Sequence, residues 1–314
     1  MNLKKPKFWD QKKPNILAYL LLPVSSLLQL LKLFKIKTKL KNSKIKTIVV
    51  GNIYLGGTGK TSLSIKINEI LNERKIKTCF VKKFYSNQYD EQRLLESRGK
   101  LFMSHKRVEA IYLAESKGYE VAILDDGLQD GSINYDLKFV CFNNINWIGN
   151  GLTIPSGPLR ENINSLKNYK HIFLNGNLEN LEDIKKYIYR INPNLNFHVG
   201  KYVPLDIKKF SKEKNYLAFS GIGNHKSFLS MLKEYKLNII KDIEFPDHYK
   251  YTNYDINKIL KLSKDLNCET ITTEKDYFRL NKENISNINF IKSELKILDE
   301  KKLISTILKI NENN

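Results

Sequence analysis

The run from Gly51 to Thr61 (Gly-Asn-Ile-Tyr-Leu-Gly-Gly-Thr-Gly-Lys-Thr) has the composition and spacing of a phosphate-binding loop. Its glycines let backbone N–H groups turn toward phosphate oxygens without obstruction from a Cβ. Lys60 is placed to reach the β- and γ-phosphates of a nucleotide, and the Thr61 hydroxyl to ligate Mg²⁺. The strict pattern has glycine at position 54, which is a tyrosine here. The residues assigned to ATP binding are Tyr54, Leu55, Gly56, Gly57, Thr58, Gly59, Lys60 and Thr61.

A second acidic group is needed to hold the magnesium from the other side, and Val121-Ala-Ile-Leu-Asp125-Asp126 provides two. Carboxylates after four apolar residues are costly unless a cation compensates them. We therefore expect Asp125 and Asp126 to hold Mg²⁺ together with Thr61. The sequence has no Asn-Lys-x-Asp motif for guanine, since Thr273-Glu-Lys-Asp276 lacks the Asn, so ATP is the expected nucleotide. ATP-driven motors and phosphotransferases share the Gly-rich loop and the magnesium-binding acids. A phosphotransferase differs in having a base that activates the acceptor.

The elements that must position these residues follow an alternating pattern. Short apolar strands are expected at 47–50, 78–81, 121–124, 138–142 and 171–174, with helices at 62–74 and 107–117 between them. This pattern predicts an α/β fold with a P-loop-type parallel sheet and the nucleotide at the carboxyl ends of its strands. A second alternation starts near residue 216, after a Gly-, Pro- and Lys-containing boundary at 200–212. The predicted domains are 47–205, which binds the nucleotide, and 206–314, a second, smaller α/β domain closing over the active site.

The first 46 residues are strongly basic. They hold twelve Lys and one acid, a net of 12 − 1 = +11 out of +20 for the whole chain. Within them, residues 16–34 place Leu and Val on one helical stripe and Ser25, Gln29 and Lys32 on the opposite side. Lys-rich text follows where a signal peptide would have its cleavage site. We interpret 1–46 as a retained membrane-anchoring segment; a single membrane span and a helix of a soluble core are the alternatives.

The composition excludes several classes of protein. The chain is 41% hydrophobic, which is enough for a substantial core and argues against a disordered protein. The three cysteines lie far apart without a Cys-x-x-Cys pair, so neither a disulfide framework nor a zinc ribbon is expected. The apolar helix inside the basic segment favours an anionic membrane surface as the partner and argues against nucleic acid. No obligate protein partner is evident.

Several further motifs resemble the tetraacyldisaccharide 4′-kinases of the lipid A pathway. After the Gly-rich loop come Asp90-Glu91, Leu-Asp-Asp-Gly-Leu-Gln129, Pro155-Ser-Gly-Pro-Leu-Arg-Glu161, Phe219-Ser-Gly-Ile-Gly-Asn224, Phe245-Pro-Asp-His248 and Thr272-Thr-Glu-Lys-Asp276, in the order that the family shows. The resemblance runs from the N-terminal helix to about residue 280. Motifs such as Asp-Asp-Gly-Leu-Gln are not general features of phosphate-binding loops.

The resemblance implies a lipid kinase at the cytosolic face of the bacterial inner membrane. It would transfer the γ-phosphate of ATP to the 4′-hydroxyl of a tetraacylated glucosamine disaccharide 1-phosphate, with Mg²⁺, giving lipid IVA. By position, Asp90 would be the acceptor-activating carboxylate and His248 the histidine that assists it. Glu161 would lie near the magnesium, and Arg107 and Arg160 would bind substrate phosphate. If Asp90 and His248 lie on different domains, catalysis would require the domains to close.

The chain departs from the family pattern in three places. Val81-Lys-Lys-Phe-Tyr-Ser86 replaces a Ser-Arg-Gly-Tyr-Gly stretch, Asp130 replaces a histidine, and Tyr249 replaces the second histidine of Phe-Pro-Asp-His-His. Two other classes of protein remain open: a membrane-anchored P-loop ATPase of the partitioning or targeting type, and a basic nucleic-acid or membrane adaptor with an inactive loop. The ATPase would turn over ATP without a sugar acceptor and would tolerate Asp90→Ala, whereas the adaptor would transfer no phosphate.

Overall fold

The computed structural model describes residues 5–33, 43–84, 89–280 and 287–310. The chain forms two compact units, a larger one of residues 5–175, 179–200 and 297–310 and a smaller one of residues 176–178 and 201–296. The main stretch of the smaller unit starts at residue 201, and the sequence analysis expected a boundary at 200–212. The chain returns to the larger unit after residue 296, whereas the sequence analysis placed all of 206–314 in the smaller domain.

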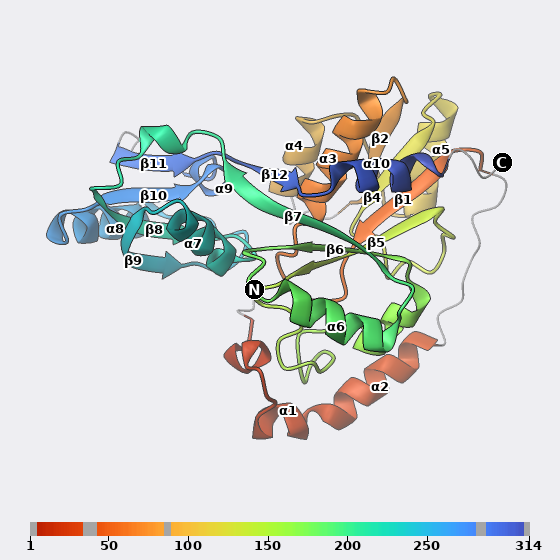
Figure 1. The fold of residues 1–314 in the computed structure, drawn as a ribbon, viewed down its shortest axis with the longest axis horizontal. Coiled ribbons are helices and arrows are strands. Elements are labelled where there is room, and N and C mark those ends of the chain that lie inside the picture. Colours follow the sequence, from red (N-terminus) through yellow and green to blue (C-terminus); the bar gives the residue numbers. More distant parts are fainter. Residues whose placement is uncertain (1–4, 34–42, 85–88, 281–286, 311–314) are drawn as a thin grey trace. The chain divides into compact units, whose positions relative to one another are not determined.

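The larger unit is built on an eight-stranded sheet (Figure 1), in the order β12-β7-β6-β5-β1-β4-β2-β3. Every expected strand is present, and each forms parallel pairs with its neighbours. The chain crosses from β4 over β1 to β5, so the strand order reverses beside β1, where ligands bind in such sheets. The strands are β1 (Lys46–Gly51), β2 (Thr78–Lys83), β3 (Leu101–Ser104), β4 (Val121–Asp125), β5 (Leu137–Asn143), β6 (His171–Asn175), β7 (Asn196–Pro204) and β12 (Ser293–Ile297).

Helices cover both faces of this sheet because its strands are apolar on both sides. On one face, a core joins β1, β2 and β4 to α5, and a neighbouring core joins β5 and β6 to α6 and a 3₁₀ turn. α3 starts directly after the Gly-rich loop and packs on β1, β2 and β4. The elements are α3 (Lys60–Asn72), α4 (Tyr89–Glu96), α5 (Arg107–Ser116), η2 (Ile163–Asn168), α6 (Leu181–Ile191) and α10 (Glu300–Leu308).

The smaller unit has its own four-stranded parallel sheet, in the order β11-β10-β8-β9, as the second alternation predicts. α7 contributes to the core on one face and α8 to the core on the other. Its elements are η3 (Ile207–Lys209), β8 (Asn215–Ser220), α7 (His225–Glu234), β9 (Asn238–Glu244), α8 (Asn253–Asp265), β10 (Glu269–Thr273), α9 (Glu274–Tyr277) and β11 (Ile288–Ile291).

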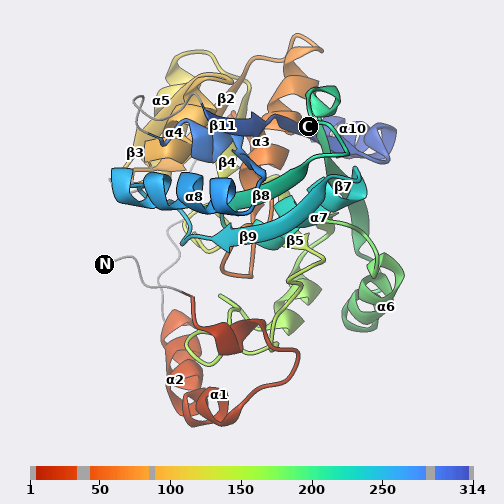
Figure 2. The ribbon, with the colours of Figure 1, turned by 90° about the vertical axis from the view of Figure 1, so that its left-hand side faces the viewer.

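The N-terminal segment folds as η1 (Lys7–Asp10), α1 (Ile16–Leu20) and α2 (Leu22–Leu33). The expected single helix over 16–34 is interrupted at Leu21, and Pro23 falls in the first turn of α2, where its missing N–H costs nothing. Figures 1 and 2 show this segment beside the yellow-green loop that follows β5. In the described part of the chain, no helix combines the length and the apolar character needed to span a bilayer. Phe34 and the lysines of 35–41 lie outside the described residues.

Candidate active site

The Gly-rich loop joins the carboxyl end of β1 to the amino end of α3. Gly59 caps the helix with a φ of 77°, a left-handed conformation that favours glycine. The Asn52 side chain donates hydrogen bonds to the Gly56 carbonyl (3.2 Å) and to the Thr58 hydroxyl (2.9 Å). The Asn175 side chain donates to the Thr58 carbonyl at 2.7 Å. These hydrogen bonds fix the loop at the positive end of a helix dipole, which is where phosphate binds.

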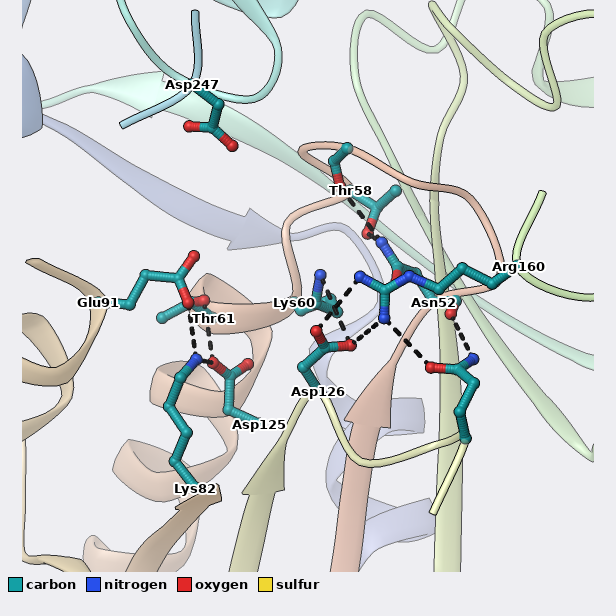
Figure 3. Close-up of polar contacts among 12 residues, drawn as sticks. Asn52, Thr58, Lys60, Thr61, Lys82, Glu91, Asp125, Asp126, Arg160 and Asp247 are labelled. Atoms are coloured by element: carbon teal, nitrogen blue, oxygen red, sulfur yellow. Dashed lines mark hydrogen bonds and ion pairs between the residues drawn. The ribbon is translucent and has the colours of Figure 1, made fainter. Parts of the chain in front are cut away.

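Beside the loop, the Thr61 hydroxyl lies 3.3 Å from the Asp125 carboxylate. The same carboxylate accepts a hydrogen bond at 2.9 Å from Lys82, whose ammonium also lies 2.6 Å from Glu91 (Figure 3). The side chains of Lys82 and Asp125 are 2% and 1% exposed. Burial alone would lower the pKa of the Lys82 ammonium, but the carboxylates of Asp125 and Glu91 raise it above its ordinary value. Lys82 therefore stays charged between the two acids.

The donor set fits a magnesium ion bound with nucleotide. The second carboxylate oxygen of Asp125, Oδ1, is buried and has no hydrogen-bond partner among the described residues. Such an oxygen, together with the Thr61 hydroxyl, matches what Mg²⁺ takes from a protein when phosphates and waters supply its other ligands. No cluster of three or more His, Cys, Asp or Glu side chains able to hold a metal occurs in the described ranges.

The neighbouring carboxylate, Asp126, faces two cations. The Arg160 guanidinium spans it, with Nη1 at 2.7 Å and Nη2 at 3.3 Å, and the Lys60 ammonium lies 3.9 Å away. Burial would raise the pKa of Asp126, but Lys60 and Arg160 lower it below the usual range. Gln129 accepts from Arg160 at 3.1 Å and donates to the Asn52 carbonyl. These contacts tie the loop after β4 to the loop of residues 149–160.

Glu161 and Arg107, two further predicted site residues, form hydrogen bonds with other side chains near Asp126. The Glu161 carboxylate accepts from Gln129 at 3.0 Å and from the Tyr169 hydroxyl at 3.2 Å. Arg107, which is 8% exposed, donates to the Asp130 carboxylate at 3.0 Å and to the Asp126 carbonyl at 2.7 Å. The aspartate that replaces the family's histidine thus pairs with Arg107. The predicted roles of Glu161 at the metal and of Arg107 at substrate phosphate stay predictions.

The predicted catalytic pair is divided between the two units. Asp90 lies in the first turn of α4 in the larger unit, and its side chain lies outside the described part of the structure. His248 belongs to the smaller unit and has a φ of 59°, uncommon for a residue with a side chain. The joint action of Asp90 and His248 stays a prediction.

The motifs of the smaller unit meet at the carboxyl edge of its sheet, around the fully buried Asp276. Its carboxylate accepts hydrogen bonds from the Gly221 N–H and the Tyr251 hydroxyl, each at 3.0 Å. Arg279 donates to the same carboxylate at 3.2 Å and to the Gly221 carbonyl at 2.8 Å, and lies 3.5 Å from Nδ1 of His248. The His248 N–H also donates to the Gly221 carbonyl. This network fixes the strained His248 loop.

Sequence reasoning missed Lys82, Asn52 and Asn175 as parts of the site. Asn52 stands inside the quoted Gly51-Asn-Ile motif, and Gln129 inside Asp-Asp-Gly-Leu-Gln, so the motifs contained a signal that was not assigned a role. Lys82 was noted only as part of a departure from the family pattern. A lysine at the end of an otherwise apolar strand is a recognisable signal, because a lysine is rarely buried unless paired.

Comparison with known proteins places these features in one family. The family model described as tetraacyldisaccharide-1-P 4′-kinase matches residues 17–312. A tetraacyldisaccharide 4′-kinase from Pelagibacter ubique (strain HTCC1062) is 60% identical over 314 residues, which is all of both chains. One from Rickettsia canadensis (strain McKiel) is 35% identical over 98% of each chain.

The fold is also found in a solved structure. The "apo" form of LpxK from Aquifex aeolicus in complex with ATP aligns with a TM-score of 0.62 at 23% identity, covering 94% of this chain and 99% of that one. At this identity the match bears on the fold alone. The family model and the relatives bear on the family itself. On their evidence, the chain belongs to the tetraacyldisaccharide-1-phosphate 4′-kinase family.

Proposed function

We propose that this protein transfers the γ-phosphoryl group of ATP to the 4′-hydroxyl of tetraacyldisaccharide 1-phosphate, giving lipid IVA. The 4′-oxygen forms a bond to the γ-phosphorus, the bond from that phosphorus to the β–γ bridging oxygen breaks, and ADP leaves. The hydroxyl proton passes to a base. The observation that carries this proposal is the Gly-rich loop at the amino end of α3, with Lys60 and Arg160 directed at one carboxylate beside it.

In this proposal the protein's own groups position and neutralise the phosphates. Backbone N–H groups of the loop and the Lys60 ammonium bind the β- and γ-phosphates, and the Arg160 guanidinium takes up charge that develops on the transferred group. In the structure both cations face Asp126. A bound triphosphate would compete with Asp126 for them, because phosphate oxygens are strong acceptors for an arginine fork.

Thr61 and Asp125 are the residues that would hold Mg²⁺, with Asp126 beside them. The ion would neutralise phosphate charge when bound. Asp90 is the proposed base for the 4′-hydroxyl, and His248 the proposed assistant, by the resemblance of their motifs to the family pattern. The Arg279 contact and the Gly221 hydrogen bond support a fixed orientation for His248.

We further propose that the N-terminal segment binds the cytosolic face of the inner membrane. The outward side of α1 and α2 is apolar and unusually exposed, with Ile16 at 78% and Leu20 at 70%. Lysines lie on both sides of this apolar stretch in the sequence, which suits a bilayer with anionic headgroups. A lipid with four acyl chains leaves a bilayer only at a cost of about 0.8 kcal/mol per CH₂, so the kinase must reach the lipid there.

The test is transfer of ³²P from γ-labelled ATP to tetraacyldisaccharide 1-phosphate in detergent micelles with Mg²⁺. We expect labelled lipid from the wild type and at least a hundredfold less from Lys60→Ala and from Asp90→Ala. Label released only as free phosphate would refute the kinase and favour a membrane-anchored ATPase. Transfer that survives Asp90→Ala would refute the base assignment alone.

A further inference from the structure

The N-terminal segment contacts the larger unit through its polar side. Ser25 of α2 is 2% exposed, although its neighbours Val24 and Leu27 are about half exposed. Its hydroxyl donates to the Thr153 carbonyl at 2.9 Å, accepts from the Ser156 N–H at 3.0 Å, and is hydrogen-bonded to the Ser156 hydroxyl at 2.8 Å. One buried hydroxyl therefore satisfies three polar groups of the loop of residues 149–160, hereafter the 149–160 loop.

η1 holds the same loop at a second point. Trp9, itself buried, donates its indole N–H to the Pro155 carbonyl at 2.9 Å, and its own carbonyl accepts from the Asn150 N–H at 2.9 Å. Gly149 approaches so closely that a Cβ at this position would lie 2.1 Å from the Trp9 carbonyl oxygen. The segment of residues 5–33 is thus closely packed against this loop.

The 149–160 loop pairs in turn with the beginning of the Gly-rich loop. Leu55 donates its N–H to the Pro158 carbonyl at 2.8 Å, and Arg160 donates its N–H to the Ile53 carbonyl at 2.6 Å. Gln29 of α2 donates to the Arg160 carbonyl at 3.4 Å. On the other side, the Tyr54 hydroxyl, which fills the position where the strict pattern has glycine, donates to Asp10 at 2.8 Å. A chain of contacts therefore runs from the apolar helices to both loops of the phosphate site.

We propose that Ser25 is a positioning residue for phosphoryl transfer, which rests on the proposed function. By fixing the 149–160 loop against the start of the Gly-rich loop, it sets the guanidinium of Arg160 relative to the phosphates. α2 consequently has two roles, with an apolar side for lipid and a polar side that orders the catalytic loop. Loss of the polar contacts impairs transfer even when delivery to the lipid is not limiting.

The experiment compares Ser25→Ala with Ser26→Ala, the adjacent and exposed serine of the same helix. Kinase activity is measured in detergent micelles, so that membrane delivery does not limit the rate. Ser25→Ala removes a hydrogen-bond partner from the Thr153 carbonyl and from the N–H and the hydroxyl of the buried Ser156. We therefore expect kcat/KM for ATP to fall at least fivefold, equal to about 1 kcal/mol. Ser26→Ala should stay within twofold of the wild type. Equal effects of the two variants would overturn the proposal.

A double-mutant cycle separates positioning from a general loss of structure. If Ser25 acts through Arg160, then Ser25→Ala should cost less than twofold in an Arg160→Ala background. A general structural defect would instead lower activity by the same factor in both backgrounds, and that result would overturn the proposal. Should Ser25→Ala fail to fold, Trp9→Phe replaces it in the cycle, because it removes the indole N–H that donates to the Pro155 carbonyl of the same loop and keeps an aromatic ring.

A binding measurement keeps this inference distinct from the proposed function. The affinity for Mg²⁺ with a non-hydrolysable ATP analogue is measured calorimetrically on the same four proteins. If the wild type phosphorylates no disaccharide, the proposed function fails, while a weaker affinity in Ser25→Ala that disappears in the Arg160→Ala background still supports the positioning role. Unchanged affinity and unchanged turnover in Ser25→Ala would refute it.

Discussion

The buried ion pair of Lys82 and Asp125 makes a quantitative prediction about metal and stability. Lys82→Met keeps the length of the side chain and removes its charge, leaving the Asp125 carboxylate, 1% exposed, without its cation. Removing one partner of a buried ion pair costs about 3–5 kcal/mol. That is a large part of the 5–15 kcal/mol that stabilises a typical protein, so we expect a clear fall in the free energy of unfolding.

Mg²⁺ should restore part of this loss, because at the proposed site the ion would bring positive charge to the same Asp125 carboxylate. We expect Mg²⁺ with an ATP analogue to raise the unfolding midpoint in urea more for Lys82→Met than for the wild type. The control is Lys138→Met, which changes a half-exposed lysine of β5 in the same sheet and should shift the midpoint little. A Lys82→Met protein as stable as the control without metal would show that the pair contributes nothing. Equal stabilisation of both proteins by Mg²⁺ would refute the link between Lys82 and the metal.

Three further predictions concern other parts of the molecule. The pKa of His171 is lowered to about 4 and that of His198 to about 3, by burial and then by nearby positive charge. In the unfolded chain these histidines take up protons near pH 6.5, so the free energy of unfolding should fall between pH 6.5 and 4, by about 2 kcal/mol per histidine at pH 5. Urea denaturation at pH 7 and at pH 5 should show that His198→Leu loses about half as much stability as the wild type. An equal loss in both proteins would contradict the prediction. Arg160→Lys should lower kcat at least tenfold, because an ammonium cannot reproduce the two contacts with Asp126; a rate near wild type would rule out the forked contact. Asp276→Asn should lower the free energy of unfolding by about 2 kcal/mol, because the amide loses the charge that faces Arg279 and its nitrogen cannot accept from the Thr273 hydroxyl. An unchanged urea midpoint would count against the network.

Local patterns were sufficient to predict the parts of the fold that come from contiguous sequence. The strand before Gly51, the glycines of the loop and the carboxylates that end β4 are adjacent in the chain, so their order alone places them at one sheet edge. The place of β12 in the eight-stranded sheet had no such signal, because β12 is short and half polar. Its place depends on pairing with a strand about a hundred residues earlier.

The site shows the same division between local and long-range information. Lys82 lies beside Asp125 because β2 and β4 pair in a register that matches Val81 with Leu124. That register joins segments about 40 residues apart, and no local periodicity specifies it. Likewise, Asp130 could be identified from sequence only as a missing histidine, whereas its hydrogen bond to Arg107 depends on how α5 packs beside the loop after β4.

In the N-terminal segment, the sequence pattern predicted two stripes on a helix but not what the polar stripe contacts. Its two stripes indicate a membrane-surface helix, and such a helix ordinarily turns its polar side to water. Here the polar side is covered by protein, since Ser25 is buried and Gln29 donates to the Arg160 carbonyl. Deleting α2 would remove the proposed lipid contact and the proposed support of the 149–160 loop together. The two roles can therefore be separated only by single substitutions on opposite sides of α2.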